Sequence, residues 1–480
     1  MPVRRIAPAG AELDVDGHPV LVVGYGVSGR AAARALAERG AIVTTVDESA
    51  PDADRADPDA IDPTAFDLLL ASPGWAPATP LLARAVDAGI PVWSEIELAW
   101  RMRSRRRADG PAPWLTITGT NGKTTTVGML ESILSAAGLR ARAVGNVGPT
   151  VVEAVCDPTV DVLAVELSSF QLHFTQSVAA RASACLNVAV DHLDWHGSFA
   201  GYLADKGRIF ERTQRACVFN VADRATEQLV RGADVEDGCV AVGFTTGAPR
   251  VGQLGVVDGV LVDRGFAPER QTHGVELATI ADLEHLAGPG GQVPRHIVEN
   301  ALAASALALA HGVEPARLRD GLRAYRSGAH RLAALGRHAG IAFVDDSKAT
   351  NAHAAEAALR SFGPASVVWI AGGLAKGADF DELVERCADR LRAVVLIGVD
   401  RDPLRRALER HAAPIPVFEV DADDTESVMT RAVEAARRLA VVGDTVVLAP
   451  ACASMDQFVS YADRGEQFTA AVRRVTGTAD

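Results

Sequence analysis

Short hydrophobic runs alternate along the chain with longer stretches in which apolar residues recur at helical spacing. The first run, Pro19 to Val23, precedes the glycine-rich residues 24–29, and the Ala-rich amphipathic stretch after them predicts a helix that ends at Gly40. A second strand is predicted at residues 41–46, with Asp47 directly after it. Strands that alternate with helices predict a parallel sheet with right-handed crossovers.

Two further units with the same pattern follow. A strand at residues 114–118 leads into a second glycine-rich turn. The helix predicted after this turn has one apolar stripe, formed by Val127, Leu130, Ile133 and Leu134. The last unit has predicted strands at residues 341–344, 367–370, 394–397 and 445–448. Residues 101–113 are basic and then rich in Pro and Gly, which predicts a solvated helix end and a linker.

The predicted fold is therefore α/β with three domains. Residues 1–108 are expected to form a Rossmann-like domain. Residues 109–327 are expected to form a central domain of the P-loop ATPase type with a parallel sheet, and residues 328–480 a second Rossmann-like domain.

Composition narrows the class of protein further. The 480 residues contain 48 Lys and Arg against 61 Asp and Glu, and the net charge of −13 argues against nucleic acid as the main partner. The six cysteines are scattered without a Cys-x-x-Cys pair, so no disulfide framework is expected. No apolar run reaches the roughly 18 residues of a membrane span. These features predict a cytoplasmic multidomain enzyme without membrane insertion.

Both glycine-rich turns stand between a strand and a helix, where backbone N–H groups can bind phosphate. Gly24-x-Gly26-x-x-Gly29, with Asp47 after the next strand, is typical of nucleotide-binding folds. This pattern alone leaves open NAD, another nucleotide diphosphate or a purely structural turn. The turn at residues 119–124 lacks the first glycine of the usual P-loop, yet Lys123 and Thr124 indicate binding of ATP phosphates and Mg²⁺.

Polar residues also stand at the ends of predicted strands, where ligands bind in parallel α/β sheets. Glu166 is a candidate anchor for Mg²⁺ at such an end. His192 and His196 lie four residues apart and allow zinc, although one histidine among oxygen ligands of Mg²⁺ or Mn²⁺ is favoured. Lys376 and Ser454 each follow a strand and suggest a site for a small substrate.

Together these motifs resemble those of the Mur ligase family, and within it those of the branch that adds D-glutamate. The resemblance is carried by residues 24–29, 71–74, 118–125, 166–172, 191–194, 346–351 and 450–458. It implies an ATP-dependent acid–D-amino-acid ligase that joins D-glutamate to UDP-N-acetylmuramoyl-L-alanine through an acyl phosphate. Such an enzyme would act as a monomer on small molecules in peptidoglycan synthesis, and so in cell wall biogenesis, cell shape and cell division.

The resemblance also implies three sets of binding residues. The UDP-sugar would contact Val27, Ser28, Asp47, Ser72, Gly74, Asn146, Ser168 and Gln171. ATP would contact Gly119, Thr120, Asn121, Gly122, Lys123, Thr124, Thr125, Asn300, Arg331 and Asp346. D-Glutamate would contact Thr350, Lys376, Ser454 and Tyr461.

A metal site and a catalytic set follow from the same resemblance. Two Mg²⁺ ions, with Mn²⁺ as an alternative, would be held by Thr124, Glu166, His192 and a carbamate on Lys206. The implied catalytic residues are Lys123, Glu166, His192 and Lys206. A carbamate reverses the charge of lysine and supplies the oxygen ligands that Mg²⁺ prefers. Without the resemblance, Lys206 would be interpreted as a solvated surface lysine.

Some features depart from the family pattern, and two other functions compete. Ile297 stands where the family usually has Asn near ATP, and Glu48-Ser49 replaces residues that contact the uracil. Residues 234–292 match poorly and have no predicted role. A related ligase that adds another amino acid or extends folate is one alternative, although the nucleotide-sugar domain argues against folate. An NAD(P)-dependent oxidoreductase would leave the second glycine-rich turn and Glu166 unexplained.

Overall fold

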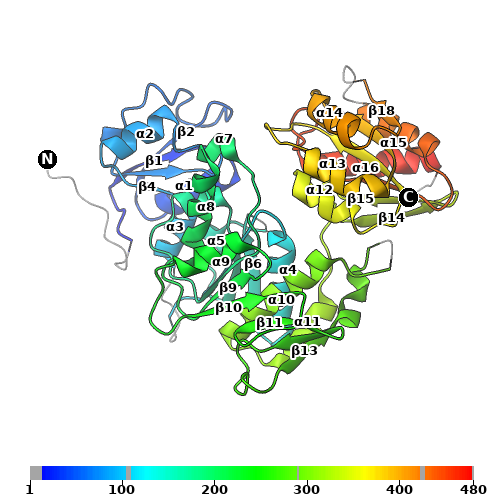
Figure 1. Cartoon of the computed structure of the whole chain (residues 1–480). Coiled ribbons are helices and arrows are strands. Elements are labelled where there is room, and N and C mark those ends of the chain that lie inside the picture. The colour runs from blue at the N-terminus through cyan, green and yellow to red at the C-terminus, as the bar shows by residue number, and fades with distance from the viewer. Residues whose placement is uncertain (1–12, 104–109, 147, 289–290, 422–426, 478–480) are drawn as a thin grey trace. The chain divides into compact units, whose positions relative to one another are not determined.

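The computed structural model describes residues 13–103, 110–146, 148–288, 291–421 and 427–477. It contains three sheets flanked by helices, and most strand pairs are parallel, which confirms the predicted α/β class (Figure 1). The chain divides into two compact units, residues 1–282 with 297–325 and residues 283–296 with 326–480. The predicted domain boundary at residue 108 lies outside the described residues, and the division into three domains stays a prediction.

The first sheet is parallel, with the strand order β2-β1-β3-β4. Its strands are β1 (Pro19–Val23), β2 (Ile42–Val46), β3 (Leu68–Ala71) and β4 (Val92–Trp93), and its helical segments are α1 (Val27–Ala37), η1 (Pro63–Ala65), α2 (Pro80–Asp87) and α3 (Glu95–Met102). Residues 20–23 are fully buried, as expected for a parallel strand covered on both faces. The strand order reverses between β1 and β3, which places a ligand crevice at their carboxyl ends.

The second sheet has the order β13-β12-β11-β10-β9-β8-β5-β7-β6 and is parallel from β6 to β11. Its strands are β5 (Trp114–Thr118), β6 (Ala141–Gly145), β7 (Val162–Glu166), β8 (Ala182–Cys185), β9 (Ala216–Asn220), β10 (Val240–Phe244), β11 (Gln253–Val257), β12 (Val260–Asp263) and β13 (Val275–Thr279). Its helical segments are α4 (Lys123–Ala136), α5 (Val151–Ala154), α6 (Ser169–His173), α7 (Leu193–His196), α8 (Phe199–Gly207), η2 (Arg208–Phe210), α9 (Arg224–Arg231), η3 (Ile280–Leu286), α10 (Arg295–His311) and α11 (Pro315–Ala324). The segment without a predicted role, residues 234–292, thus supplies β10 to β13.

The third sheet has the order β14-β15-β19-β16-β17-β18, and β14 is its antiparallel strand. Its strands are β14 (Ala333–His338), β15 (Ile341–Asp345), β16 (Val367–Gly372), β17 (Leu391–Ile397), β18 (Val417–Glu419) and β19 (Thr445–Leu448). Its helical segments are α12 (Ala352–Leu359), α13 (Asp381–Cys387), η4 (Ala388–Arg390), α14 (Asp402–His411), α15 (Val428–Leu439) and α16 (Tyr461–Thr476). Because β19 lies between β15 and β16, the residues after these three strands meet at one edge.

Helix α11 packs closely on α4, the helix that follows the second glycine-rich turn. A Cβ on Gly321 would lie 2.3 Å from the Cα of Ile133, so only glycine allows this approach. Ser132 donates a hydrogen bond to the carbonyl of Gly321 at 2.7 Å. The predicted apolar stripe of α4 is buried, which confirms that prediction. Among the helices of the described residues, none is long and apolar enough to cross a lipid bilayer.

Candidate nucleotide and metal-binding site

The first glycine-rich turn is held at the carboxyl ends of β1, β2 and β3. Gly24 has a φ of +90°, and its carbonyl accepts a hydrogen bond from Ser72 Oγ at 2.9 Å. Asp47 accepts hydrogen bonds from the N–H groups of Tyr25 and Ser49, both at 2.7 Å. The Tyr25 N–H lowers the pKa of Asp47 below its ordinary value, so the carboxylate stays ionised beside the turn.

Two glycines of this turn differ sharply in the space around them. A Cβ on Gly29 would lie 2.0 Å from the carbonyl oxygen of Gly24, whereas nothing lies within 4 Å of a Cβ on Gly26. We therefore expect Gly29→Ala to lower the free energy of unfolding by roughly 1–3 kcal/mol and to weaken nucleotide-sugar binding. Gly26→Ala is the matched control and should leave stability nearly unchanged in urea unfolding. Equal stability of the two variants would contradict the close packing of the turn.

Two of the predicted nucleotide-sugar contacts, Ser168 and Gln171, lie at the start of helix α6. Ser168 caps α6, and its N–H donates to Gln171 Oε1 at 2.8 Å in a capping box. The Gln171 amide donates to Glu95 Oε1 at 2.7 Å. Burial raises the pKa of Glu95 more than the hydrogen bonds from Gln171 and Ser28 lower it. Glu95 therefore joins two predicted contacts, Ser28 and Gln171, and local sequence patterns missed it because its partner lies 76 residues away.

The turn after β5 has the geometry of a phosphate loop. Gly122 has a φ of +84° and caps α4, so the first N–H groups of the helix are free of intrahelical partners. Lys123 Nζ donates to the carbonyls of Gly119 and Thr120 at 2.8 and 3.0 Å. A Cβ on Gly122 would lie 2.5 Å from Asn300 Oδ1, which places this predicted ATP contact beside the loop. Thr124 and Thr125 follow Lys123 in the first turn of α4.

The loop is braced by residues that sequence analysis did not single out. Asn187 Oδ1 accepts a hydrogen bond from the Asn121 N–H at 2.8 Å, and the Asn187 carbonyl accepts one from the Thr120 N–H at 3.0 Å. Thr120 Oγ1 lies 2.9 Å from the hydroxyl of Tyr202, whose pKa is raised by burial. Asn187 follows β8 and Tyr202 lies on α8. Their closeness in the sequence to predicted metal ligands was the one feature from which their role could have been predicted.

Glu166 is well suited to bind a hard cation. It ends β7, next to β5, and is 1% exposed. Asn146 donates to Glu166 Oε1 at 3.3 Å, whereas Oε2 is buried and has no hydrogen-bond partner in the described part of the chain. Such an unsatisfied oxygen is costly unless a ligand such as Mg²⁺ is bound. Within the described ranges, no group of three or more His, Cys, Asp or Glu is arranged to hold a metal ion.

Lys206 is one of the most buried charged residues. It lies on α8, is 2% exposed, and its Nζ is 4.7 Å from the centre of the Tyr202 ring. Burial and repulsion from Lys123 lower its pKa to about 7. The interpretation of Lys206 as a surface lysine is therefore wrong. A neutral amine is the form that adds CO₂, so the residue fits the implied carbamate.

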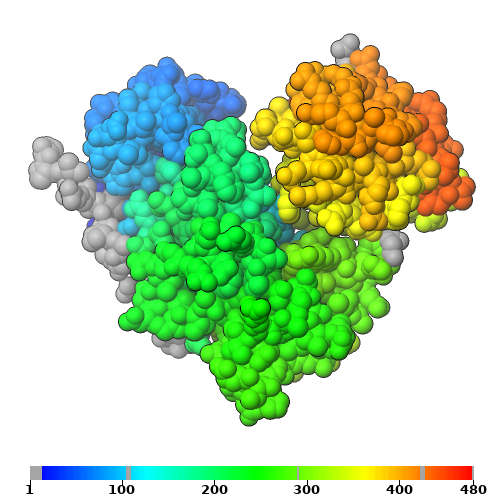
Figure 2. All heavy atoms as spheres, viewed as in Figure 1, coloured from blue at the N-terminus to red at the C-terminus, as the bar shows by residue number. Residues whose placement is uncertain are grey.

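The two histidines of the zinc alternative have different environments. His192 has a φ of +53° at the start of α7, and its ring makes an edge contact with Phe170 at 4.8 Å. The side chain of His196 is fully buried, and its two ring nitrogens have Asp205 and Ser169 as partners. The pair therefore does not share a metal-binding face. Figure 2 shows the segment around α7 at the surface of the first unit, and Trp195 packs against the core of the first sheet.

In the second unit, predicted contacts gather after β15, β16 and β19. Asp346 follows β15, and burial raises its pKa to about 8, although the nearby Arg331 lowers it. Thr350 also follows β15, Lys376 follows β16, and Ser454 follows β19. Leu374 and Ala453 form a β-bridge that joins the last two loops.

Two residues missed by the sequence analysis hold these loops together. Arg464 is fully buried and donates to the carbonyls of Ser347 and Cys452 at 2.9 and 3.1 Å. Burial lowers its pKa to about 10, so it remains a cation at neutral pH. His330 lies 2.6 Å from Asp345 Oδ2. The ring of Tyr461, a predicted D-glutamate contact, lies 3.7 Å from Lys348 Nζ.

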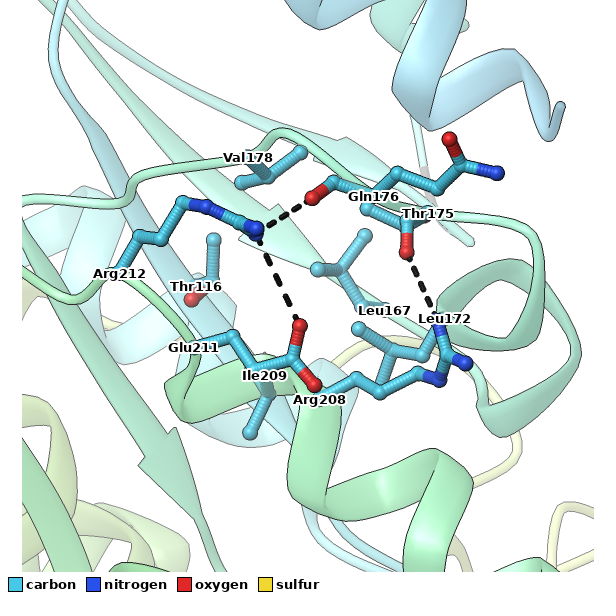
Figure 3. Close-up of a pocket in the computed structure, with 10 residues that line it drawn as sticks. All are labelled: Thr116, Leu167, Leu172, Thr175, Gln176, Val178, Arg208, Ile209, Glu211 and Arg212. Atoms are coloured by element: carbon cyan, nitrogen blue, oxygen red, sulfur yellow. Dashed lines mark hydrogen bonds and ion pairs between the residues drawn. The ribbon is translucent and has the colours of Figure 1, made fainter. Parts of the chain in front are cut away.

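A small cavity lies beside the end of α6 and is too small for a substrate. Its volume is about 10 Å³, enough for about one water molecule. Figure 3 shows Arg208 reaching from this cavity to the Thr175 carbonyl, with which it forms a hydrogen bond of 3.1 Å. The cavity thus marks a contact between α6 and η2.

The fold and the loop after β5 define a multidomain α/β protein with a P-loop type of turn. Residues 117–308 match the family model of the Mur ligase middle domain, and residues 330–452 match that of the Mur ligase glutamate ligase domain. The chain belongs to the Mur ligase family, which confirms the resemblance.

Relatives and solved structures agree with this membership. The UDP-N-acetylmuramoylalanine--D-glutamate ligase of Streptomyces avermitilis is 56% identical over 472 residues, covering 95% of this chain and 98% of the relative. The protein of the same name from Mycolicibacterium smegmatis is 44% identical, covering 96% of this chain and 97% of the relative. A pseudomurein peptide ligase type C from Methanothermus fervidus shares the fold, with a TM-score of 0.58 and 16% identity over 96% of this chain and all of that one. A UDP-N-acetylmuramate-alanine ligase from Thermotoga maritima has a TM-score of 0.55 and 16% identity over 95% of this chain and all of that one.

Proposed function

We propose that the chain is the ATP-dependent ligase that joins D-glutamate to UDP-N-acetylmuramoyl-L-alanine in peptidoglycan synthesis. The observation that carries this assignment is the 56% identity to a relative of that activity along 98% of the relative's length. The protein would act as a cytoplasmic monomer, and its product would feed cell wall growth and division.

The proposed chemistry activates a carboxylate, which is a poor acylating agent because its leaving group would be oxide. The L-alanyl carboxylate attacks the γ-phosphorus of ATP and forms an acyl phosphate with release of ADP. The amine of D-glutamate then attacks the acyl carbon, and phosphate leaves as the amide forms. Bound Mg²⁺, as two ions or replaced by Mn²⁺, would supply neutralisation of phosphate charge.

The described residues have separate roles in this proposal. Lys123 and the N–H groups at the start of α4 would hold the ATP phosphates, with Asn300, Arg331 and Asp346 at the rest of the nucleotide. Thr124, Glu166, His192 and a carbamate on Lys206 would hold the metal. Lys376 would pair with a carboxylate of D-glutamate in a charge-assisted contact.

The test is phosphate release from ATP across a panel of amino acids. We expect release to require both UDP-N-acetylmuramoyl-L-alanine and D-glutamate. L-Lysine, D-alanine and L-alanine should support phosphate release at least about a hundredfold less well. All three lack the side-chain carboxylate of D-glutamate, and L-lysine and L-alanine also have the opposite configuration at the α-carbon. Turnover of any of them at the rate of D-glutamate would reject the assignment. A saturable NADPH fluorescence titration would favour an oxidoreductase instead.

A further inference from the structure

Asp205 stands at the centre of a hydrogen-bond network beside the proposed metal site. It precedes Lys206 on α8, and each of its carboxylate oxygens has a different histidine partner. His173 Nδ1 lies 2.8 Å from Oδ1, and His196 Nδ1 lies 2.8 Å from Oδ2. His173 ends α6 and His196 ends α7, so one carboxylate joins three helices.

The network continues through the second ring nitrogen of His196. Its Nε2 lies 2.9 Å from Ser169 Oγ, at the first residue of α6. The His196 ring stacks on Phe170 at 5.5 Å and lies 5.2 Å from the Tyr202 ring. Arg208, the first residue of η2 directly after α8, donates a hydrogen bond to the carbonyl of Thr175, two residues after α6, and so joins these two parts of the chain a second time (Figure 3).

The order Ser169–His196–Asp205 has the connectivity of a nucleophilic triad, yet it cannot act as one. Ser169 is 3% exposed and the His196 side chain is fully buried, so no substrate carbonyl can reach the hydroxyl. Each carboxylate oxygen of Asp205 lies 2.8 Å from the Nδ1 atom of one of the two histidines, so the carboxylate accepts one hydrogen bond from each ring. We therefore interpret the role of this hydrogen-bond network as structural.

The three joined helices carry, or directly adjoin, three of the proposed metal ligands. Glu166 lies three residues before the start of α6, His192 immediately precedes α7, and Lys206 lies on α8. Mg²⁺ requires nearly octahedral geometry at about 2.0–2.1 Å, and groups that orient its ligands affect affinity by about 10–100-fold. Any rotation of α8 about its axis would change the position of the Lys206 side chain, which the metal site of the proposed function requires to be fixed.

We propose that Asp205 is a positioning residue that, through His173 and His196, fixes α6, α7 and α8 relative to one another and so aligns Glu166, His192 and Lys206 for metal binding. This inference rests on the metal ligands of the proposed function. Asp205 itself touches neither metal nor substrate.

Matched substitutions at His196 separate the two arms of the network. In His196→Asn the amide nitrogen can replace Nδ1 and keep the bond to Asp205, while the bond to Ser169 is lost. In His196→Gln the amide nitrogen can replace Nε2 and keep Ser169, while the bond to Asp205 is lost. Both variants lose the ring, so their difference shows which of the two bonds, to Asp205 or to Ser169, maintains the alignment.

The alignment of the proposed metal ligands can be measured by two methods that do not depend on enzyme turnover. The first is Mg²⁺ titration, by calorimetry, of the binding of a non-hydrolysable ATP analogue. The second is the ¹³C carbamate resonance of the protein in ¹³C-bicarbonate, which is easily assigned because only four of the 48 basic residues are lysines. We expect His196→Gln and Asp205→Asn to raise the half-saturating Mg²⁺ concentration roughly 10–100-fold and to weaken the carbamate signal. His196→Asn should stay within about threefold of the parent.

The controls keep the test decisive. Asp237→Asn, at an exposed residue of the same unit, should change neither readout. If the His196 variants do not fold, the pair His173→Asn and His173→Gln repeats the comparison at a ring that is 30% exposed. Equal effects of the Asn and Gln variants, or unchanged Mg²⁺ dependence in Asp205→Asn, would overturn the proposal. Because neither readout uses D-glutamate, a wrong amino-acid assignment would leave this result interpretable.

Discussion

Replacing Lys206 with methionine is expected to make the chain more stable and almost inactive. The Lys206 amine is buried, and attraction to Asp191 does not offset burial and repulsion from Lys123. Moving the pKa from the ordinary 10.5 to about 7 corresponds to a cost on the order of 3–5 kcal/mol for the charged form. Methionine has a similar length without the charge, so Lys206→Met removes this cost. Loss of this proposed metal ligand should lower kcat/KM by roughly a thousandfold, or about 4 kcal/mol.

The gain in stability should depend on pH in a defined direction. Below pH 7 the amine is protonated in both the folded and the unfolded chain, so the full cost of burial is present. Between pH 7 and 10.5 the unfolded chain binds the extra proton, so the stability of the parent rises with pH and the advantage of Lys206→Met shrinks. Urea unfolding in CO₂-free buffer at pH 6.5 and pH 9.5 measures this difference.

A second lysine provides the control for stability. Lys376 is exposed, so Lys376→Met should leave the unfolding free energy nearly unchanged at both pH values. If Lys206→Met were less stable than the parent at pH 6.5, the amine would have a compensating partner in solution. If it kept full activity, Lys206 would not be a metal ligand.

The candidate site residues that could be predicted from the sequence all belong to short motifs of neighbouring residues. Glycine-rich turns and strand-end carboxylates are contiguous with the strands that position them, so Gly24, Lys123 and Glu166 could be predicted before the fold was known. The three-sheet α/β class followed from the same alternation of strands and helices.

The residues that sequence analysis missed depend on long-range contacts. Glu95 meets Gln171 across 76 residues and Asp205 meets His173 across 32, so neither pair forms a local motif. The burial of Lys206 was equally hidden, because its own helix α8 shows ordinary amphipathic spacing. One compositional signal was available. The chain uses arginine for nearly all its positive charge and has only four lysines. Lys123 and Lys348 fall in motifs that carry the family resemblance, Lys206 is the implied carbamate, and Lys376 is an implied D-glutamate contact.

Removing the Lys123 side chain is expected to abolish productive ATP binding while nucleotide-sugar binding survives. The ammonium lies between the carbonyls of Gly119 and Thr120 and is positioned to neutralise phosphate at the start of α4. We expect Lys123→Ala to lower kcat/KM for ATP roughly a thousandfold, about 4 kcal/mol of lost electrostatic stabilisation. Lys123→Arg should fail as well, because a planar guanidinium does not fit between two carbonyls that accept from a compact ammonium.

Calorimetry with a non-hydrolysable ATP analogue and, separately, with UDP-N-acetylmuramoyl-L-alanine distinguishes a local defect from a general one. The precursor should bind Lys123→Ala with the affinity of the parent, because the glycine-rich turn after β1 is held by Ser72 and Asp47 and not by the loop after β5. Arg140→Ala, at an exposed residue paired with Asp161, should change neither affinity. Retention of ATP affinity within about threefold in Lys123→Ala would place the nucleotide elsewhere. Loss of both affinities would mean that the loop supports the fold of the whole first unit, since β5 is an inner strand of the second sheet, between β8 and β7, and the helix after it, α4, packs on α11.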